Sequence, residues 1–310
     1  MKAIVIKEFG NADKLQLAEV KRPECTEDQL LIKVMAAGLN PVDTKIRSGR
    51  HISCSTLQLP AILGKDMSGI VEVVGGNVKG FKVGDPVFGC INSTYAAYAV
   101  ASPEFIVKKP EKISFEVAAA VSLAGLTAYQ AINDHLNVSS GQRVLIQSAA
   151  GGVGHLAVQF AKLQGAFVYG TASGKNIEFL KDLGVDQPIN YKEERFEDIA
   201  TNIDAVMDTM GGEILYRSIA LVKPGGKVVC LPSSTKDDPK AIALAQEKGV
   251  DLIWFMMQPE KGILQTISDL LNDEKLRVEI QQIFPMQEIA QAHQLIETHG
   301  VRGKIVVRLE

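Results

Sequence analysis

Short apolar segments alternate with glycine and proline through the first ~120 residues. They are rich in β-branched residues, as strands are. Four of them are MKAIVIKEF (1–9), LLIKVMAAGL (30–39), MSGIVEVVGG (67–76) and FKVGDPVFG (81–89). Closely spaced short strands predict a compact, largely antiparallel β domain. The next pattern is helical and covers 114–134, where Ser114 is placed as an N-cap and Glu116 follows it.

From Gly141 onward the pattern changes to alternating strands and helices. Such alternation predicts a parallel, doubly wound sheet with right-handed crossovers. The expected strands are 143–149, 166–172, 205–212, 225–232 and 251–258, and the expected helices are 153–164, 176–183 and one near 213–222.

The last segments form a third pattern: VEIQQIFP (278–285), a helix at 286–300 and the strand RGKIVVRL (302–309). A single strand at the C-terminal end needs a sheet to join. We expect it to return to the first domain, which would make that domain discontinuous. Periodicity alone leaves this point open.

Composition excludes several classes of protein. The chain has 310 residues, 46% hydrophobic and 22% charged, which suits two folded domains and is unlike a disordered chain. A net charge of −3 provides no general attraction to nucleic acid or an anionic membrane, so neither is expected as a partner. No continuous apolar run reaches the ~18–20 residues of a membrane span, and the N-terminus reads as a strand rather than a signal peptide.

Cysteine usage favours a reducing compartment. The four cysteines, Cys25, Cys54, Cys90 and Cys230, are far apart and form no Cys-x-x-Cys pair. A structural zinc site of the common kind is therefore not expected, nor are disulfides. We expect a cytoplasmic protein.

One loop carries the main chemical signal. In AAGGVGHLAVQFAK (149–162), Ala149, Gly151 and Gly154 occupy the small positions of a Gly-x-Gly-x-x-Gly turn between a strand and a helix. Gly151 and Gly152 permit backbone angles that side chains forbid and let a pyrophosphate approach the helix N-terminus. Gly154 lets helix and strand pack closely. A tight turn without a ligand is the alternative, but the strand–loop–helix context favours a dinucleotide.

The end of the next strand indicates which dinucleotide. NAD-specific folds place an acid there to bind the ribose hydroxyls, whereas this strand ends GTASGKN (170–176). Ser173 can donate to a phosphate and Lys175 adds positive charge, so the sequence favours NADP(H). A solvated charge at a helix start is the alternative reading of Lys175.

Four motifs together resemble the medium-chain dehydrogenase/reductase superfamily, and within it the zinc-free quinone oxidoreductase and enone reductase branch. They are AAGLNPVDTKIRSG (36–49), GKDMSGIVEVVGGNVKGFKVGDPVFG (64–89), AGLTAYQAI (124–132) and the glycine loop. The resemblance implies an α/β fold with a GroES-like β-barrel domain, 1–125 plus 265–310. A Rossmann-like NADP(H)-binding domain, 126–264, would lie between the two segments.

No metal is expected. Zinc-dependent members of the superfamily need a cysteine near Asn40 and a His-Glu pair after Gly64, where this chain has LNPVD and GKD. Asn40 and Lys65 are poor zinc ligands, and the five histidines are scattered. Without a Lewis acid, reduction of an electron-poor quinone or conjugated enone remains feasible.

The resemblance also implies a set of cofactor residues. The pyrophosphate would meet the glycine loop, Thr171 and Tyr191 would join Ser173 and Lys175 at the 2′-phosphate end, and Thr127 and Leu231 would lie near the nicotinamide. A surface tyrosine and a threonine bonded to its own helix are the alternatives for Tyr191 and Thr127. The full set is Asn40, Asp43, Thr127, Gly151, Gly152, Val153, Thr171, Ser173, Lys175, Tyr191, Leu231 and Arg302.

The predicted catalytic residues are Lys45 and Tyr95. Lys45 would stabilise an enolate or bind the cofactor, against the alternative of a surface lysine. Tyr95 would bind the substrate oxygen or donate a proton. The family pattern there is closer to Gly-Ser-x-Ala-Glu-Tyr and this chain has Ala97 in the glutamate's place, so a packing tyrosine is an equal alternative. For Asn40 and Asp43, helix capping is the alternative. Lys304, like Arg302, is expected to reach the cofactor.

The leading function is an NADPH-dependent reductase of quinones or α,β-unsaturated carbonyls. The alternatives are a non-catalytic NADPH-binding or redox-sensing protein, an alcohol dehydrogenase and a scaffold without a ligand. The family suggests a homodimer, and the apolar segment from Trp254 to Met256 reads as core or subunit interface.

Overall fold

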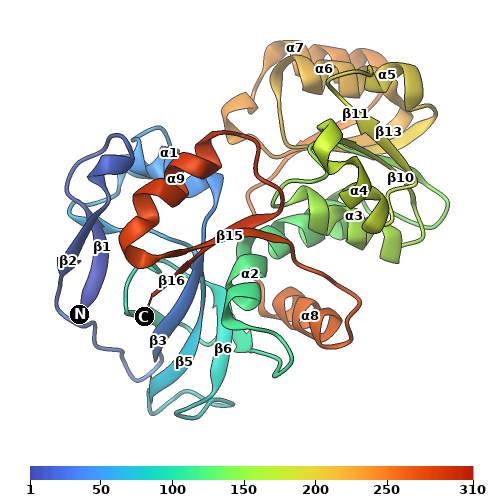
Figure 1. Cartoon of the computed structure of the whole chain (residues 1–310). Helices are drawn as coiled ribbons and strands as arrows, with labels where there is room; N and C mark the ends of the chain where they lie inside the picture. The colour runs from blue at the N-terminus through green and yellow to red at the C-terminus, as the bar shows by residue number, and fades with distance from the viewer. Residues whose placement is uncertain (310) are drawn as a thin grey trace. The chain divides into compact units, whose positions relative to one another are not determined.

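The computed structural model describes residues 1–309, which form two compact units. The first unit combines Met1–Leu126 with the segment from Pro259 onward, and the second is Thr127–Gln258 (Figure 1). The second boundary precedes the expected residue 265. The reason is that helix α8 (Lys261–Asn272) packs against strand β8 (Ile106–Lys108), where the Ser268 hydroxyl donates to the Lys108 carbonyl at 3.3 Å.

Two antiparallel sheets form the first unit. One has the order β2-β1-β4, and the other has the order β15-β16-β3-β5-β6-β8 with β7 added to β3. The strands are β1 (Lys2–Ile6), β2 (Gln16–Glu19), β3 (Leu30–Gly38), β4 (Ala61–Ile62), β5 (Asp66–Val74), β6 (Pro86–Cys90), β7 (Tyr98–Ala101), β8, β15 (Ile280–Pro285) and β16 (Lys304–Arg308). Among the described strands of this unit, only β15 and β16 pair in parallel.

The C-terminal strand joins this first unit. β16 pairs antiparallel with β3, with Val307 opposite Ala37, and its buried residues enter the same core as β1 and β3. Helices α1 (Pro41–Arg47), α2 (Phe115–Tyr129), α8 and α9 (Ile289–Glu297) and the short turns η1 (Ala12–Lys14), η2 (Ile52–Ser55) and η6 (Met286–Glu288) complete the unit.

Helix α2 begins where the sequence predicts. The Ser114 hydroxyl accepts the Val117 backbone N–H at 3.2 Å, as an N-cap does. The helix continues through the π-helical turn η3 (Gln130–His135). Among residues 1–309, Phe115–His135 alone has the length and hydropathy of a membrane span, and 67% of its apolar 18-residue window is buried inside the structure. A core helix passes the same test, and Ser122 and Thr127 interrupt its apolar residues.

A six-stranded parallel sheet forms the second unit, with the order β11-β10-β9-β12-β13-β14. Its strands are β9 (Arg143–Ile146), β10 (Phe167–Ala172), β11 (Gln187–Asn190), β12 (Ile203–Asp208), β13 (Val222–Cys230) and β14 (Asp251–Trp254). Its helices are α3 (Gly154–Leu163), α4 (Ile177–Asp182), α5 (Phe196–Ile199), α6 (Gly212–Leu221) and α7 (Pro239–Lys248), with short turns η4 (Gly174–Asn176) and η5 (Ser233–Thr235).

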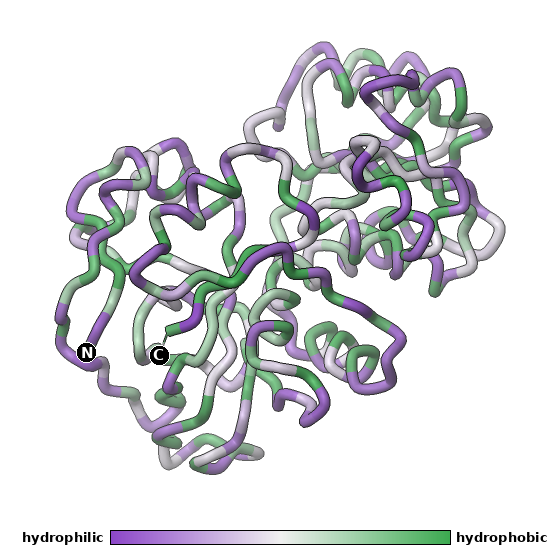
Figure 2. The backbone as a smooth tube through the Cα atoms, viewed as in Figure 1, coloured by the Kyte–Doolittle hydropathy of each residue, from purple (hydrophilic) through white to green (hydrophobic). Residues whose placement is uncertain are grey.

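The strand order creates a switch point. The chain runs from β9 outward through β10 and β11, then returns to place β12 on the other side of β9. In open parallel sheets, ligands bind beyond the carboxyl ends of the strands at such a point. Apolar and polar stretches alternate along the trace in both units (Figure 2), and the buried residues of this sheet form one apolar core. The parallel, doubly wound sheet expected from the alternation is confirmed, as is the Rossmann-like domain that the resemblance implies.

Candidate active site

The turn after β9 makes the sharp change from strand to helix. Ser148 adopts a left-handed conformation (φ 53°), whereas Gly151 and Gly152 are not among the glycines with left-handed backbone angles. The expectation that Gly151 and Gly152 supply the special angles is therefore wrong: the turn is made three residues earlier. We call residues 148–153 the cofactor loop.

Gly154 has the packing role that the sequence predicts. A Cβ there would lie 2.2 Å from the Ser148 carbonyl oxygen and 2.9 Å from the Ala149 Cα. Side chains cannot approach that closely, so helix α3 can begin directly against the loop only because residue 154 is glycine. A Cβ at Gly151 would lie 3.1 Å from Ser148 Oγ and 3.2 Å from the Ser148 carbonyl oxygen, which is tight but less severe than the collision at residue 154.

Thr171 does not lie where the sequence places it. Its side chain is 3% exposed; its hydroxyl donates to Gln147 Oε1 at 2.7 Å and accepts the Ser148 backbone N–H at 3.0 Å. Gln147 Nε2 in turn donates to Ser218 Oγ at 3.1 Å. Because this hydroxyl is already used inside the unit, a contact between Thr171 and the 2′-phosphate is not supported.

Ser173, Lys175 and Tyr191 lie at the carboxyl ends of two neighbouring strands. β10 and β11 pair up to Ala172 opposite Asn190, and the Tyr191 N–H donates to the Ala172 carbonyl at 3.1 Å. Ser173 and Lys175 follow Ala172 directly, and Tyr191 is 55% exposed. The region has no acid at the end of β10 and suits a phosphate on the ribose.

Asp208 is a site residue that sequence reasoning missed. It ends β12 at the switch point, fully buried, and its Oδ1 accepts the N–H groups of Met210 (2.8 Å) and Gly211 (2.6 Å). Its Oδ2 is buried with no hydrogen-bond partner among the described residues. Burial raises the pKa of this carboxyl above its usual value. Leu231 follows β13 and donates its N–H to the Asp208 carbonyl at 2.9 Å, so Leu231 lies at the same edge.

These residues fit a dinucleotide. The loop, the ends of β10 and β11, the unpartnered Asp208 oxygen and Leu231 all lie along the carboxyl edge of one sheet. Thr127, 9% exposed, lies in the part of α2 that belongs to this unit. Arg302 belongs to the first unit and forms an ion pair with Glu279 at 2.7 Å.

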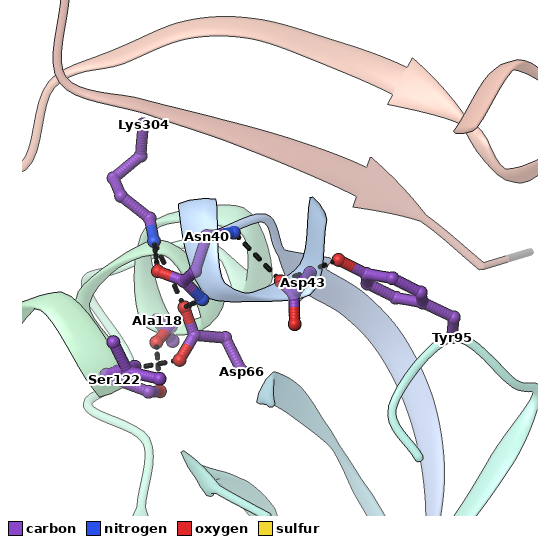
Figure 3. Close-up of polar contacts among 8 residues, drawn as sticks. Asn40, Asp43, Asp66, Tyr95, Ala118, Ser122 and Lys304 are labelled. Atoms are coloured by element: carbon purple, nitrogen blue, oxygen red, sulfur yellow. Dashed lines mark hydrogen bonds and ion pairs between the residues drawn. The ribbon is translucent and has the colours of Figure 1, made fainter. Parts of the chain in front are cut away.

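The first unit contains a buried polar cluster of Asn40, Asp43, Asp66, Tyr95 and Lys304 (Figure 3). Lys304 Nζ contacts Asn40 Oδ1 (2.5 Å) and Asp66 Oδ2 (3.2 Å), and Asn40 Nδ2 donates to Asp66 Oδ2 (2.9 Å). The expectation that Lys304 reaches the cofactor is wrong, because its side chain is 3% exposed and paired with Asp66.

Asp66 also holds helix α2. Its Oδ1 accepts the Leu123 backbone N–H at 2.6 Å. A Cβ at Gly38 would lie 2.7 Å from Asp66 Oδ2, so β3 needs glycine there. Burial raises the pKa of Asp66 more than Lys304 and its hydrogen bonds lower it. The pair therefore links β16, β5 and α2 at the centre of the unit.

Tyr95 is a packing residue with a capping contact. It is fully buried in the core, and its hydroxyl donates to Asp43 Oδ2 at 2.9 Å, the oxygen that also accepts the Asn40 backbone N–H. Burial and Asp43 raise the pKa of Tyr95 well above its usual value. A buried hydroxyl whose proton is already donated to Asp43 is poorly placed to protonate a substrate, so the structure favours the packing role for Tyr95. Asp43 caps α1 instead.

Lys45 lies one turn along α1 and is half-buried. Its side chain has no hydrogen-bond or ion-pair partner within residues 1–309. Lys65 is also half-buried and donates to the neutral Asn92 Oδ1 at 2.5 Å. Burial, then Lys45, then Lys65 lower the pKa of His51. The positive charges of Lys45 and Lys65 thus both act on the His51 imidazole.

The residues present do not fit zinc. At the family's ligand positions, the Asn40 amide is occupied by Asp66 and Lys304, and Lys65 carries an ammonium group. No group of three or more His, Cys, Asp or Glu side chains in residues 1–309 could hold a metal ion.

Comparison with known proteins agrees with the fold and the loop. A family model described as alcohol dehydrogenase GroES-like domain matches residues 26–111, and one described as zinc-binding dehydrogenase matches 183–307. A 2-methylene-furan-3-one reductase of Solanum lycopersicum is 34% identical, over 99% of this chain and 79% of its own length. An NADPH-dependent alkenal/one oxidoreductase of Arabidopsis thaliana is 33% identical with the same coverage.

A solved structure extends the likeness. The quinone oxidoreductase from Coxiella burnetii is 42% identical, with a TM-score of 0.95 over 100% of this chain and 99% of its own. The chain belongs to the medium-chain dehydrogenase/reductase superfamily. Within that superfamily it falls in the branch of quinone oxidoreductases and enone reductases.

Proposed function

We propose that this chain is an NADPH-dependent reductase that transfers a hydride to a quinone or an α,β-unsaturated carbonyl. The observation that carries the proposal is the carboxyl edge of the parallel sheet. It has a glycine loop at the switch point, and Ser173 and Lys175 stand where an NAD-binding fold has an acid. Relatives named for the reduction of enones and quinones support the same reaction.

The chain's residues bind and orient both reactants. Gly151 has no side chain to obstruct a pyrophosphate above the N-terminus of α3, whose positive dipole end favours an anion. Ser173, Lys175 and Tyr191 take the 2′-phosphate, and Leu231 and Thr127 border the nicotinamide. NADPH, when bound, supplies the hydride, and the other residues decide how the acceptor is held.

Lys45 stabilises the charge that develops on the acceptor. Hydride addition to the β-carbon of an enone moves an electron pair to the carbonyl oxygen, and the α-carbon then takes a proton from water. A half-buried ammonium group without a protein partner is suited to that oxygen, and Lys65 adds positive charge nearby.

The direct test is NADPH consumption by purified, metal-analysed protein. The acceptors are a simple 1,4-quinone and a short aliphatic enone, and NADH is the cofactor control. Loss of NADPH with either acceptor supports the proposal, and the preferred acceptor names the substrate class. NADPH binding without turnover of either acceptor would overturn it in favour of a binding or redox-sensing role.

Three variants test the assignment of Lys45. Lys45→Met should lower kcat by roughly 10²-fold, the cost of removing one oxyanion partner. Lys79→Met, the same change at an exposed lysine in a loop, should leave kcat unchanged. Tyr95→Phe should keep kcat and lower only stability. A large loss of kcat in Tyr95→Phe, with Lys45→Met unaffected, would reverse the two roles.

We also propose a homodimer that forms through β14 in a reducing cytoplasm. β14 is the outermost strand of its sheet, pairs only with β13, and continues into Met256, which is 62% exposed. The four cysteines are free thiols. Met256→Asp should convert a dimer to a monomer in sedimentation experiments. A monomer in the unmodified protein at micromolar concentration would contradict the dimer.

A further inference from the structure

Thr171 touches the cofactor loop from inside the second unit. Its backbone carbonyl accepts the Ala149 N–H at 2.8 Å, and its hydroxyl oxygen accepts the Ser148 N–H at 3.0 Å. One residue of β10 therefore binds two consecutive N–H groups at the start of the loop. With a side chain 3% exposed, Thr171 lies beneath the loop rather than on the binding surface.

Gln147 orients the Thr171 hydroxyl. The hydroxyl has a single proton, which it donates to Gln147 Oε1 at 2.7 Å, so its lone pairs are left for Ser148. Gln147 is itself held on two sides: its backbone N–H donates to Met207 O at 3.0 Å and its Nε2 to Ser218 Oγ at 3.1 Å. Contacts with β12 and α6, made through Gln147, therefore help to orient the Thr171 hydroxyl oxygen that accepts the Ser148 N–H.

Ser148 is the residue of the loop that needs such support. It carries a side chain at φ 53°, a conformation that residues with a Cβ rarely adopt and that surrounding contacts must maintain. Its carbonyl accepts the Gly151 N–H at 2.9 Å and lies where a Cβ on Gly154 would collide. The conformation of Ser148 therefore sets where the loop turns and where α3 begins.

We propose that Thr171 is a positioning residue, which holds the cofactor loop in its binding conformation through the backbone of Ser148. This inference rests on the proposed binding of a dinucleotide at the loop. The loop faces the pyrophosphate, which NADPH and NADH share. Loss of the Thr171 hydroxyl therefore weakens both cofactors by the same factor and leaves the preference between them unchanged.

The experiment measures dissociation constants for NADPH and NADH by nicotinamide fluorescence, without any acceptor. Thr171→Val keeps the shape and removes the hydroxyl. Both dissociation constants should rise about five- to tenfold, the effect of one lost hydrogen bond. Thr171→Ser, which restores the hydroxyl, should return both toward the unmodified values. Steady-state kinetics should show a raised cofactor KM with kcat nearly unchanged.

Two further variants separate positioning from general destabilisation. Ile219→Val removes a buried methyl group from the last turn of α6 and should lower the melting temperature without changing either dissociation constant. A glycine at position 148 adopts the left-handed backbone angle freely. Ser148→Gly added to Thr171→Val should therefore recover part of the lost affinity for both nucleotides. That recovery also tests the proposal if Thr171→Val alone is too unstable to measure.

Each other outcome overturns the proposal in its own way. A rise for NADPH alone would mean that Thr171 contacts the 2′-phosphate directly. Unchanged constants for both nucleotides would mean that the loop does not depend on the hydroxyl. Failure of the unmodified protein to bind either nucleotide would reject the proposed function itself, which is a distinct result.

Discussion

Lys175 is the single residue on which cofactor choice should depend most. It follows β10 at the edge shared with Tyr191, and no acid there repels a 2′-phosphate. Lys175→Ala should raise the dissociation constant for NADPH about tenfold and leave that for NADH unchanged, because only NADPH carries the phosphate. Fluorescence titration of both nucleotides measures this.

The matched control for Lys175 lies on the next helix. Lys181→Ala removes an exposed lysine of α4 whose partner is Glu178, and it should leave both dissociation constants unchanged. An equal loss of NADPH and NADH in Lys175→Ala would count against a 2′-phosphate contact.

At the scale of single residues, exposed cofactor residues could be predicted from the sequence and buried partners could not. Ser173 and Lys175 follow a strand that the apolar pattern locates, and the family resemblance places Tyr191 beside them, so their common edge was foreseeable. The partners of Gln147 and Asp66 come from distant elements: Gln147 bonds Ser218, and Asp66 bonds Lys304. Nothing local in the sequence marks such pairs. The sequence left Tyr95 open between a catalytic and a packing role for the same reason, since its burial depends on the packed core.

The junction between the cofactor loop and α3 tolerates little change. Gly154→Ala should lower the free energy of unfolding by about 1–3 kcal/mol, because its Cβ would collide with the Ser148 carbonyl and α3 would have to move. Chemical denaturation measures this change.

Gly151→Ala in the same loop is the counterpart. Its Cβ would make tight contacts of 3.1 Å and 3.2 Å with Ser148 but would not collide. Stability should therefore fall less than in Gly154→Ala, whereas NADPH should bind more weakly because the methyl group occupies the cofactor's approach. Equal stability losses in both variants would contradict this division of roles between the two glycines.

At the scale of elements, the alternating pattern located most strands and helices of the second unit, but β11, α5 and α7 were not among the predicted elements. The N-cap of α2 at Ser114 was also readable, because capping is a local interaction. The left-handed turn at Ser148 could not be predicted, because it depends on a contact with Thr171 on the neighbouring strand β10. Glycine is the usual residue for such angles, so the sequence pointed to Gly151 and Gly152 instead.

In the molecule as a whole, one buried pair ties the C-terminal strand to the first unit. Lys304→Met would leave the Asp66 carboxylate buried without its cation and should cost about 3–5 kcal/mol of stability. The double variant Lys304→Met/Asp66→Asn should recover most of that loss. Urea denaturation measures both, with Lys33→Met on exposed β3 surface as control.

The stability of the double variant shows whether the loss in Lys304→Met comes from charge or from packing. If Lys304→Met/Asp66→Asn were no more stable than Lys304→Met alone, the loss would come from packing of the lysine stem and not from an uncompensated charge.

Two buried groups of the first unit should give stability opposite dependences on pH. Burial raises the pKa of Asp43 from 3.8 to about 7, so between these values the native state binds more protons than the unfolded chain, and stability falls as pH rises. Burial, with Arg47, lowers the pKa of His293 from 6.5 to about 3. There the unfolded chain binds more protons, and stability rises with pH.

Single substitutions should reveal how each group contributes to the pH dependence of the free energy of unfolding. Asp43→Asn removes the falling contribution, so its free energy of unfolding should rise from pH 4 to pH 6.5 more steeply than that of the unmodified protein. His293→Asn, which keeps an acceptor for Arg47, should leave stability falling between pH 4 and pH 7. Each pKa unit corresponds to about 1.4 kcal/mol. Parallel pH profiles for all three proteins would refute the assignment.

The sequence by itself determined the class of fold, the place of the cofactor loop and the absence of an acid after β10. These features depend on the spacing of apolar residues, on the positions of glycines and on residues that are neighbours in the sequence. Tertiary structure alone decided that Thr171 lies under the loop, that Tyr95 and Lys304 are buried and that Asp208 keeps an unpartnered oxygen at the switch point. Burial and hydrogen-bond partners are set by elements far apart in the sequence, which meet only when the strands pair and the helices pack.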